Sequence, residues 1–453
     1  MRLSLLVFLF GLYSTLAFGQ QPPADQQGQD QHQHGQQQKA QEHHDHGAMT
    51  ASTMDPREAS GTAWQPRESP IYGVHRQWKG WDVMFHGNVF GQFLYEPGDI
   101  HRTGGEQSTQ VSSVNWGMAM LRREVRGGRL GLRSMLAVEP WTVGDCGFIN
   151  LLASGETCDG DAIHDRQHPH DLLMELAADY DRPLRGSVRW QIYGGLSGEP
   201  ELGPPGFPHR VSSLPNPAAP ISHHWIDSTH IAFGLVTGAL YGPRWKTEFS
   251  VFNGREPDEN RADLDLAPLD SFSGRMAFLP TPGLALQISA AHLEEAEVAH
   301  AGELPIDVAR VTASGTYHRL AGASVWATTL AYGTNGEDER HLSGDITRAW
   351  THAFLVETNY TRDERHSFFG RGEIAQKPAH DLDAHELGDR TFGVGKMSGG
   401  YTRYMTHGSG VSLGVGGFVS AAIVPRELTD RYVRRVAPGI GFFVTLRPPR
   451  HTP

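Results

Sequence analysis

The chain has 453 residues and carries 39 Lys and Arg against 51 Asp and Glu, a formal net charge of −12 at pH 7. Nucleic-acid-binding domains are usually basic, so this charge argues against nucleic acid as a partner. The length is sufficient for one large domain or for two or three ordinary ones.

The first residues have the pattern of a secretory signal peptide. A short positive start at residues 1–2 precedes the apolar run LSLLVFLF at 3–10, and small residues at 17–19 suit signal peptidase. We therefore expect a signal peptide over 1–19, with cleavage before Gln20. The alternative is an N-terminal membrane anchor, but the apolar run is shorter than the roughly 20 residues of a spanning helix.

Residues 20–60 are dominated by glutamine and histidine, with almost no apolar side chains. Such a segment cannot offset the entropy cost of ordering, so we expect a disordered periplasmic tail, followed by a transition segment at 61–80. Neutral imidazole binds copper, zinc and nickel, so the tail is a candidate metal site, although no cofactor is required. The alternative is a soluble spacer. The candidate ligands are His32, His34, His43, His44 and His46, with Asp45, Met49 and Met54 nearby.

Residues 81–448 alternate apolar and polar side chains with period two, in runs of about ten residues. Trp245 and Phe249, for example, oppose Lys246 and Glu248. The pattern predicts about sixteen strands, within a range of about 14 to 18. The runs begin near Trp81, Ser112, Gly128, Asp171, Gly186, Asp227, Arg244, Asp270, Gly283, Asp307, Ala323, Thr351, Ser367, Arg390, Gly410 and Gly439.

The connections between these runs alternate between tight turns and long loops. That asymmetry is typical of an outer-membrane barrel, with short periplasmic turns and long external loops. We therefore predict an all-β fold, a transmembrane antiparallel β-barrel with both termini on the periplasmic side. A soluble sandwich or propeller is the alternative, since those folds also alternate apolar and polar residues. The long loops are expected at 96–111, 143–170, 201–226, 254–269, 294–306, 334–350, 378–389 and 425–438.

Five stretches carry a resemblance to known proteins: GTAWQPRESP, VNWGMAMLRRE, DRQHPHDLLMELA, ISHHWIDSTHIAFG and FNGREPDENRADLDLAPLDSFSGR. Over roughly residues 60–448 the chain resembles a family of uncharacterised bacterial outer-membrane, porin-like proteins. The resemblance implies the fold and the location, and no settled activity. The His-rich tail ahead of a barrel is also similar in layout to copper-resistance protein B, which is an analogy without a shared motif.

Charged residues on the inward-facing positions predict a polar lumen of mixed sign. Mixed signs argue against strong ion selectivity. No plug domain is recognisable ahead of the barrel, because the tail is too polar to be one. We expect passive transport of small hydrophilic solutes or ions, with outer-membrane lipid as partner and the oligomeric state open; a structural barrel is the alternative. The predicted pore-lining residues are Arg133, Glu139, Lys246, Glu248, Arg371, Glu373 and Lys377.

Imidazole and carboxylate groups concentrate in two of the long loops, which precede strands separated by one other strand. They could converge at the pore mouth as a metal site or a selectivity constriction; the alternative is a hydrogen-bonded network that folds the loops into the barrel. The cluster comprises His164, Asp165, His168, His170, Asp171, His223, His224, Asp227 and His230.

Three smaller features complete the chemistry. Cys146 and Cys158, the two cysteines of the chain, are expected to form a disulfide in one external loop. An acidic loop over 255–270 is a candidate calcium site or a solvated loop. A lipid hydrolase is the alternative class of function, with Ser222 or Ser228 beside the loop histidines, but no GxSxG elbow is present.

Overall fold

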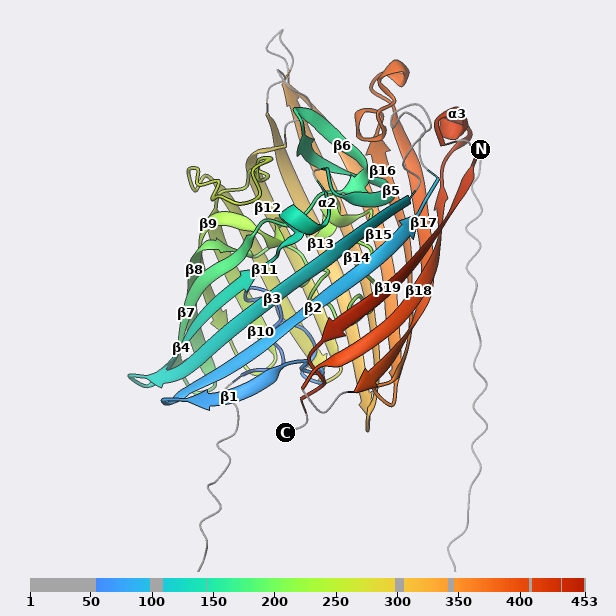
Figure 1. Cartoon of the computed structure of the whole chain (residues 1–453). Helices are drawn as coiled ribbons and strands as arrows, with labels where there is room; N and C mark the ends of the chain where they lie inside the picture. Colours follow the sequence, from blue (N-terminus) through green and yellow to red (C-terminus); the bar gives the residue numbers. More distant parts are fainter. Residues whose placement is uncertain are drawn as a thin grey trace, which may run out of the picture. The chain divides into compact units, whose positions relative to one another are not determined.

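The strands of the alternating region close on themselves. The computed structural model describes residues 54–97, 109–144, 146–297, 305–340, 346–406, 410–432 and 434–451. Within these ranges, each barrel strand pairs antiparallel with its neighbours in the chain, and the last strand pairs with the first, Ile440 with Tyr95. The result is a closed antiparallel barrel of sixteen strands, as predicted (Figure 1).

The barrel strands begin within a few residues of the predicted positions. They are β2 (Trp81–Tyr95), β3 (Thr109–Val125), β4 (Gly128–Leu136), β7 (Leu173–Arg185), β8 (Val188–Gly198), β9 (Ala232–Tyr241), β10 (Trp245–Phe252), β11 (Ser271–Thr281), β12 (Leu284–Glu297), β13 (Ile306–Ala321), β14 (Ser324–Arg340), β15 (Ile346–Arg362), β16 (His366–Pro378), β17 (Thr391–Thr406), β18 (Ser412–Ile423) and β19 (Val436–Arg447).

The remaining elements are short. β1 (Val74–Trp78) pairs with β2 across a tight turn, and β5 (Phe148–Cys158) pairs with β6 (Asp161–Gln167) in the connection between β4 and β7. Helical turns fill other connections: α1 (Glu139–Thr142), α2 (His223–Ile226), η1 (Ser228–His230), η2 (His380–Leu382), η3 (His385–Leu387), η4 (Arg426–Leu428) and α3 (Thr429–Tyr432). None of the helices in the described ranges is long and apolar enough to cross a membrane.

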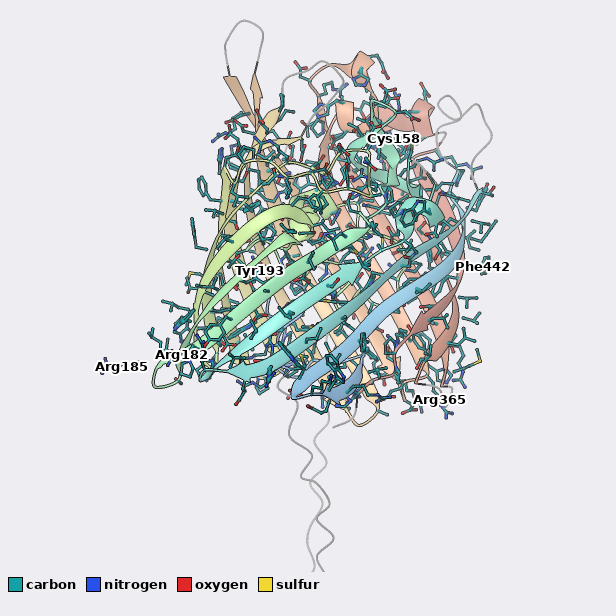
Figure 2. The ribbon with its side chains drawn as sticks, turned by 60° about the vertical axis from the view of Figure 1, so that its left-hand side comes forward. Cys158, Arg182, Arg185, Tyr193, Arg365 and Phe442 are labelled. Carbon is teal, nitrogen blue, oxygen red and sulfur yellow. A yellow bond between two sulfur atoms is a disulfide. The ribbon has the colours of Figure 1, made fainter. Side chains whose placement is uncertain are left out.

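The wall of the barrel is apolar outside and polar inside. Along β10, Trp245 and Phe249 are exposed, whereas Lys246 and Glu248 are buried. Phe442, on β19, lies on the outer surface (Figure 2) with 55% of its area exposed. A soluble β-protein has the opposite polarity, because water must cover its outer face. The outer face here suits lipid, and the chain is an outer-membrane β-barrel.

The two rims differ as the loop lengths predict. Arg182, Arg185 and Arg365 lie at the rim with the tight turns, and Cys158 lies at the opposite rim (Figure 2). The beginning and the end of the barrel domain meet near the tight turns, where Tyr72 forms a bridge with Arg450.

The long loop expected at 334–350 is wrong. The stretch 334–350 does not form a long loop, because β14 continues to Arg340 and β15 begins at Ile346. An ion pair between Asp338 and Arg348, which face each other across the two strands, extends this hairpin. The end of β14 and the start of β15 are rich in polar residues, which do not alternate with apolar ones. The period-two pattern therefore did not identify them as strands.

Residues 54–70 correct the expected domain boundary. This segment packs inside the barrel near the tight turns, where Met54 and Trp64 are buried. The boundary predicted at residue 60 therefore lies within an ordered segment, and the last residues of the tail, judged too polar to form a plug domain, belong to a segment that lies inside the barrel. Hydrogen bonds and ion pairs to the barrel wall hold residues 54–70 in place. Such contacts form between polar groups, so the segment becomes ordered although it has few apolar side chains. The expected signal peptide and most of the expected tail, residues 1–53, lie outside the described residues.

Candidate functional site

The connection between β8 and β9, residues 199–231, folds into the lumen. Its polar groups find partners on the inner wall: Arg210 Nε donates to Glu357 Oε1 at 2.7 Å, and Ser222 Oγ donates to Glu373 Oε2 at 2.7 Å. The expected external loop at 201–226 is therefore an internal one. We call residues 199–231 the lumen segment.

The lumen segment meets residues 54–70 inside the barrel. The Thr62 hydroxyl lies 2.7 Å from a Glu201 oxygen and 2.6 Å from a Glu248 oxygen. The Gly206 amide donates to the Ser60 hydroxyl at 3.0 Å. Residues 54–70, which precede β1, and the lumen segment thus contact each other and narrow the path through the barrel.

The seven predicted pore-lining residues are all buried, with at most 6% of their area exposed. Six lie on wall strands; Glu139 instead begins α1, beyond the end of β4. Lys246 Nζ donates to the Thr62 carbonyl at 2.8 Å, and Arg371 Nη1 donates to the Ala218 carbonyl at 2.6 Å. These groups therefore bind the inserted segments rather than face open water. Arg133 donates to the Gly61 carbonyl, Lys377 to the Ser154 hydroxyl, and Glu373 accepts from Ser222.

Five of the predicted loop histidines come together in the lumen. We call His168, His170, His223, His224 and His230 the histidine cluster. Its central ring is His223, whose centroid lies 5.1 Å from that of His230, 5.4 Å from that of His224 and 5.9 Å from that of His168. The rings of His170 and His230 are 5.2 Å apart. All five residues are buried.

Each ring of the histidine cluster is oriented through its Nδ1 atom. The nearest carboxylate oxygens lie at 3.1 Å for His168 (Glu156), 2.9 Å for His170 (Glu139), 2.8 Å for His223 (Asp227) and 2.9 Å for His224 (Glu256). His230 Nδ1 lies 2.8 Å from the Asp227 carbonyl. An oxygen acceptor next to Nδ1 selects the tautomer with its proton there, so the Nε2 atom keeps a free lone pair.

Burial keeps most of the cluster neutral. It lowers the pKa of His223 to about 4 and that of His224 to about 3, and it lowers the pKa values of His168 and His230 well below the usual range. Burial also acts on His170, but the Glu139 carboxylate outweighs it and raises the pKa of that imidazole. At neutral pH the lumen thus holds four uncharged imidazoles beside one that binds a proton more readily.

The other predicted loop residues occupy the surroundings of the histidine cluster. Asp227 also forms an ion pair with Arg210, which holds the pKa of that carboxyl below its usual range against the effect of burial. Asp171 lies 3.8 Å from Arg261, and His164 Nδ1 lies 2.9 Å from the Asp381 carbonyl.

A second group of soft side chains lies nearer the tight turns. Six buried methionines belong to one core cluster with Trp116, and a cavity of about 80 Å³ next to them is lined by Met54, Met84, Met120, His86 and His209. His209 Nε2 lies 3.3 Å from Met135 Sδ. Only Met54 among these methionines belonged to a sequence-based prediction. Period-two alternation places the others on inward positions, but it does not tell a metal-binding thioether from a packing one. The six methionines are Met54, Met84, Met118, Met120, Met135 and Met174.

The hydroxyl groups of the serines proposed for a hydrolase hydrogen-bond to residues other than the histidines. Ser222 donates to Glu373, and Ser228 accepts from Arg310 Nη1 at 2.7 Å. The nucleophile–base hydrogen bond on which such a site depends is formed by neither serine, so the geometry does not favour that alternative.

The acidic loop is tied to the barrel by ion pairs. Arg255 binds Asp270 at 3.0 Å and Glu295 at 2.6 Å. Asp258, Asp263 and Asp265 have carboxylate oxygens within 4.8 Å of one another.

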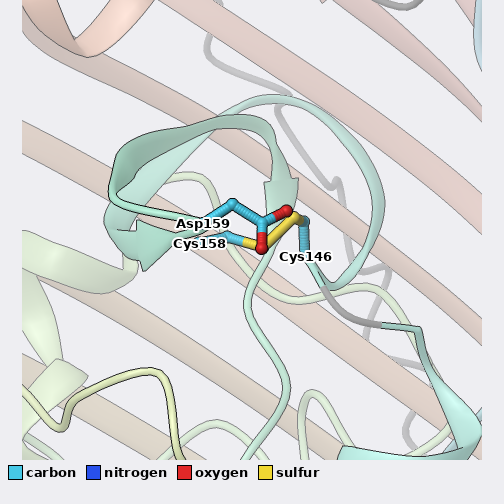
Figure 3. Close-up of side chains that lie close together, drawn as sticks. All are labelled: Cys146, Cys158 and Asp159. Atoms are coloured by element: carbon cyan, nitrogen blue, oxygen red, sulfur yellow. A yellow bond between two sulfur atoms is a disulfide. The ribbon is translucent and has the colours of Figure 1, made fainter.

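Cys146 and Cys158 form the predicted disulfide, in the connection between β4 and β7. Figure 3 shows the bonded sulfur atoms with the Asp159 carboxylate beside them. The bond joins the residues just before β5 to the turn of the β5–β6 hairpin, which carries Glu156, 3.1 Å from His168 Nδ1. The tail histidines, His32 to His46, lie outside the described residues.

Comparison with known proteins gives structural neighbours alone. No family model and no curated protein matches the chain. The outer membrane channel DcaP of Acinetobacter baumannii superposes with a TM-score of 0.47 at 12% identity, over 83% of this chain and 100% of that one. An anion-selective porin from Comamonas acidovorans gives 0.47 at 10% identity, over 81% and 99%. OprB of Pseudomonas putida gives 0.44 at 8%, over 82% and 94%. The fold assignment rests on the strand pairing of this chain itself.

Proposed function

We propose that this protein is an outer-membrane channel that passes small hydrophilic solutes or ions down their gradients. The observation that carries this function is the polarity of the barrel, whose outer face is apolar while its inner face is lined by charged and polar side chains. A barrel of sixteen strands is wide enough for an aqueous path unless inserted segments fill it. The path here is narrowed by the lumen segment and by residues 54–70.

The mixed charges of the lumen are compensated in pairs. Arg210 and Arg371 both bind Glu357, and Arg275 binds Glu248 at 3.0 Å. Paired charges attract neither sign strongly, which supports passage without marked selectivity. Because these pairs also hold the inserted segments, they control how wide the path is.

The test is conductance of the full chain in planar lipid bilayers. The wild-type protein is expected to conduct in small steps, and Arg210→Ala, which removes the ion pair between the lumen segment and Glu357, is expected to give larger steps. Arg348→Ala is the matched control, because this arginine pairs with Asp338 at the exposed end of a hairpin. Silent membranes for both the wild type and Arg210→Ala would contradict the channel and favour a structural barrel.

The tail histidines support a second part of the proposal, a link to copper, zinc or nickel. Five imidazoles within fifteen residues, from His32 to His46, give several ligand sets without a folded site. Replacing all five with alanine in the full chain is expected to remove the metal ions that the tail binds, as measured by equilibrium dialysis. An unchanged number of bound ions would refute the tail as a ligand.

A further inference from the structure

The histidine cluster contains five nitrogen atoms without a hydrogen-bond partner. The Nε2 atoms of His168, His170, His223, His224 and His230 are buried and have no hydrogen-bond partner among the described residues. Leaving a buried polar atom without a partner is energetically costly. Five such atoms on neighbouring rings favour a ligand that accepts several lone pairs at once.

We propose that the histidine cluster binds a divalent transition-metal ion, of the zinc, copper or nickel class, through Nε2 atoms, with His223 as the central ligand. This site is independent of the tail and does not depend on conduction through the barrel.

The ring spacing agrees with shared coordination. An imidazole binds zinc at about 2.1 Å, so the centres of two rings on one tetrahedral ion lie about 5 Å apart. His223 has three imidazole neighbours at centroid distances from 5.1 to 5.9 Å. Among the described residues, no three Nε2 atoms of the cluster lie within 4.8 Å of one another, so the side chains must rotate to place three of them on one ion.

The surroundings are those of a metal site as well. In protein metal sites, a ligating imidazole generally donates its other N–H group to a carboxylate or a carbonyl, which fixes the ring and strengthens it as a ligand. Glu139 and Asp227 provide the carboxylates for His170 and His223, and backbone carbonyls of Pro169 and Asp227 lie at Nδ1 of His168 and His230. A hydrogen-bonded network that served only to fold the loops into the barrel would also provide hydrogen-bond partners for the Nε2 atoms.

The experiment measures Zn(II) binding by the full chain in detergent. The five tail histidines are first replaced with alanine, so that the tail does not compete. This parent protein is expected to bind zinc, with at least three imidazoles in its X-ray absorption spectrum. His223→Gln keeps a hydrogen-bond donor for Asp227 but removes a ligand of the ion. Loss of a residue that only supports a ligand weakens metal binding by roughly 10- to 100-fold, so loss of the ligand itself is expected to weaken zinc binding by at least that much.

His318→Gln is the matched control, because His318 is also buried, with Nδ1 at 2.8 Å from the Ser69 hydroxyl and no partner at Nε2, but outside the cluster. It is expected to leave zinc affinity unchanged. Should His223→Gln fail to fold, His230→Gln replaces it, since His230 is the nearest ring to His223. A parent protein without zinc binding, equal affinities of parent and cluster variant, or a spectrum with oxygen ligands alone would overturn the proposal.

A different observation supports a second site. The cavity of about 80 Å³ is lined by Met84, Met120, His86 and His209, and the buried His86 Nε2 atom has no hydrogen-bond partner. Thioether sulfur is a soft ligand that prefers monovalent copper, and imidazole tolerates the same ion. We infer that this methionine-lined cavity binds Cu(I) or the chemically similar Ag(I).

Silver titration of the same full-chain parent tests this inference. The double variant Met84→Leu/Met120→Leu conserves core volume, so the barrel should remain folded while silver affinity falls by on the order of tenfold. The control is Met276→Leu/Met397→Leu, since these two methionines face lipid with 59% and 61% of their area exposed. Equal losses in both double variants, or no loss in either, would refute a site in the cavity.

Discussion

At the scale of single residues, the lumen is organised by buried charges that each hold more than one partner. Arg210 lies between Glu357 on the wall and Asp227 in the lumen segment, and it donates to the Pro205 carbonyl at 3.0 Å. One guanidinium therefore bridges two carboxylates, and Arg371 also binds Glu357. Losing one partner of such a group leaves uncompensated charge in a poorly solvated place.

Arg210→Met is accordingly expected to destabilise the protein by about 3 to 5 kcal/mol, the cost of breaking a buried pair. Urea unfolding in detergent micelles, followed by tryptophan fluorescence, measures this change. Arg348→Met, at an exposed pair with Asp338, should cost less than about 1 kcal/mol. Similar losses for the two variants would mean that the lumen pairs are well solvated.

At the scale of elements, the contact between the lumen segment and residues 54–70 depends on pH. Burial raises the pKa of Glu199 to about 8 and that of Glu201 to about 7. An unfolded carboxyl has a pKa near 4.3, so the folded contact favours the protonated forms. Its stability is full below about pH 4 and is lost as the pH rises through 7 to 8.

We therefore expect conductance to rise between pH 6 and pH 9, from about one unit below the lower of these two pKa values to about one unit above the higher. Ionised Glu199 and Glu201 repel each other, and Glu248 repels Glu201, next to Ser60 and Thr62. The variant Glu199→Gln/Glu201→Gln should show a flat profile, because its side chains do not titrate. A variant that retains the full pH dependence would assign it to other groups.

The β5–β6 hairpin is a second element with a local role. Its disulfide closes a sequence separation of 12 residues outside the barrel wall. Loops of about 15 residues are stabilised by about 3 kcal/mol when closed in this way. Reduction of the disulfide, or Cys146→Ser/Cys158→Ser, should speed proteolysis within residues 144–172. In gel electrophoresis, the difference in mobility between the unheated, folded barrel and the heated, unfolded chain should not change. Loss of this difference would show that the hairpin supports the wall.

At the scale of the whole molecule, different parts of the chain close the barrel wall and fill its interior. The pairing of β19 with β2 completes the wall without any residue before Val74, apart from the Tyr72 bridge. Residues 54–70 fill space and bind charges such as Arg122 and Arg133 through Glu58. Deleting residues 20–70 should therefore leave a folded barrel with a larger conductance than deletion of 20–53. Equal conductances for the two deletions would show that the segment does not obstruct the path.

The sequence alone was sufficient for the wall, since lipid outside and polar groups inside impose a period-two pattern on every strand. Lys246 and Glu248 were assigned to the interior from that pattern. The disulfide between Cys146 and Cys158 was predicted because both cysteines lie in one loop of a protein with an export signal. The interior was decided by tertiary structure. Trp64, Arg210 and His223 lie in segments without periodicity, and their partners are far away in the sequence, on strands that the barrel brings around them. Whether a polar loop turns outward to water or inward to the wall depends on those partners, and no local pattern encodes them.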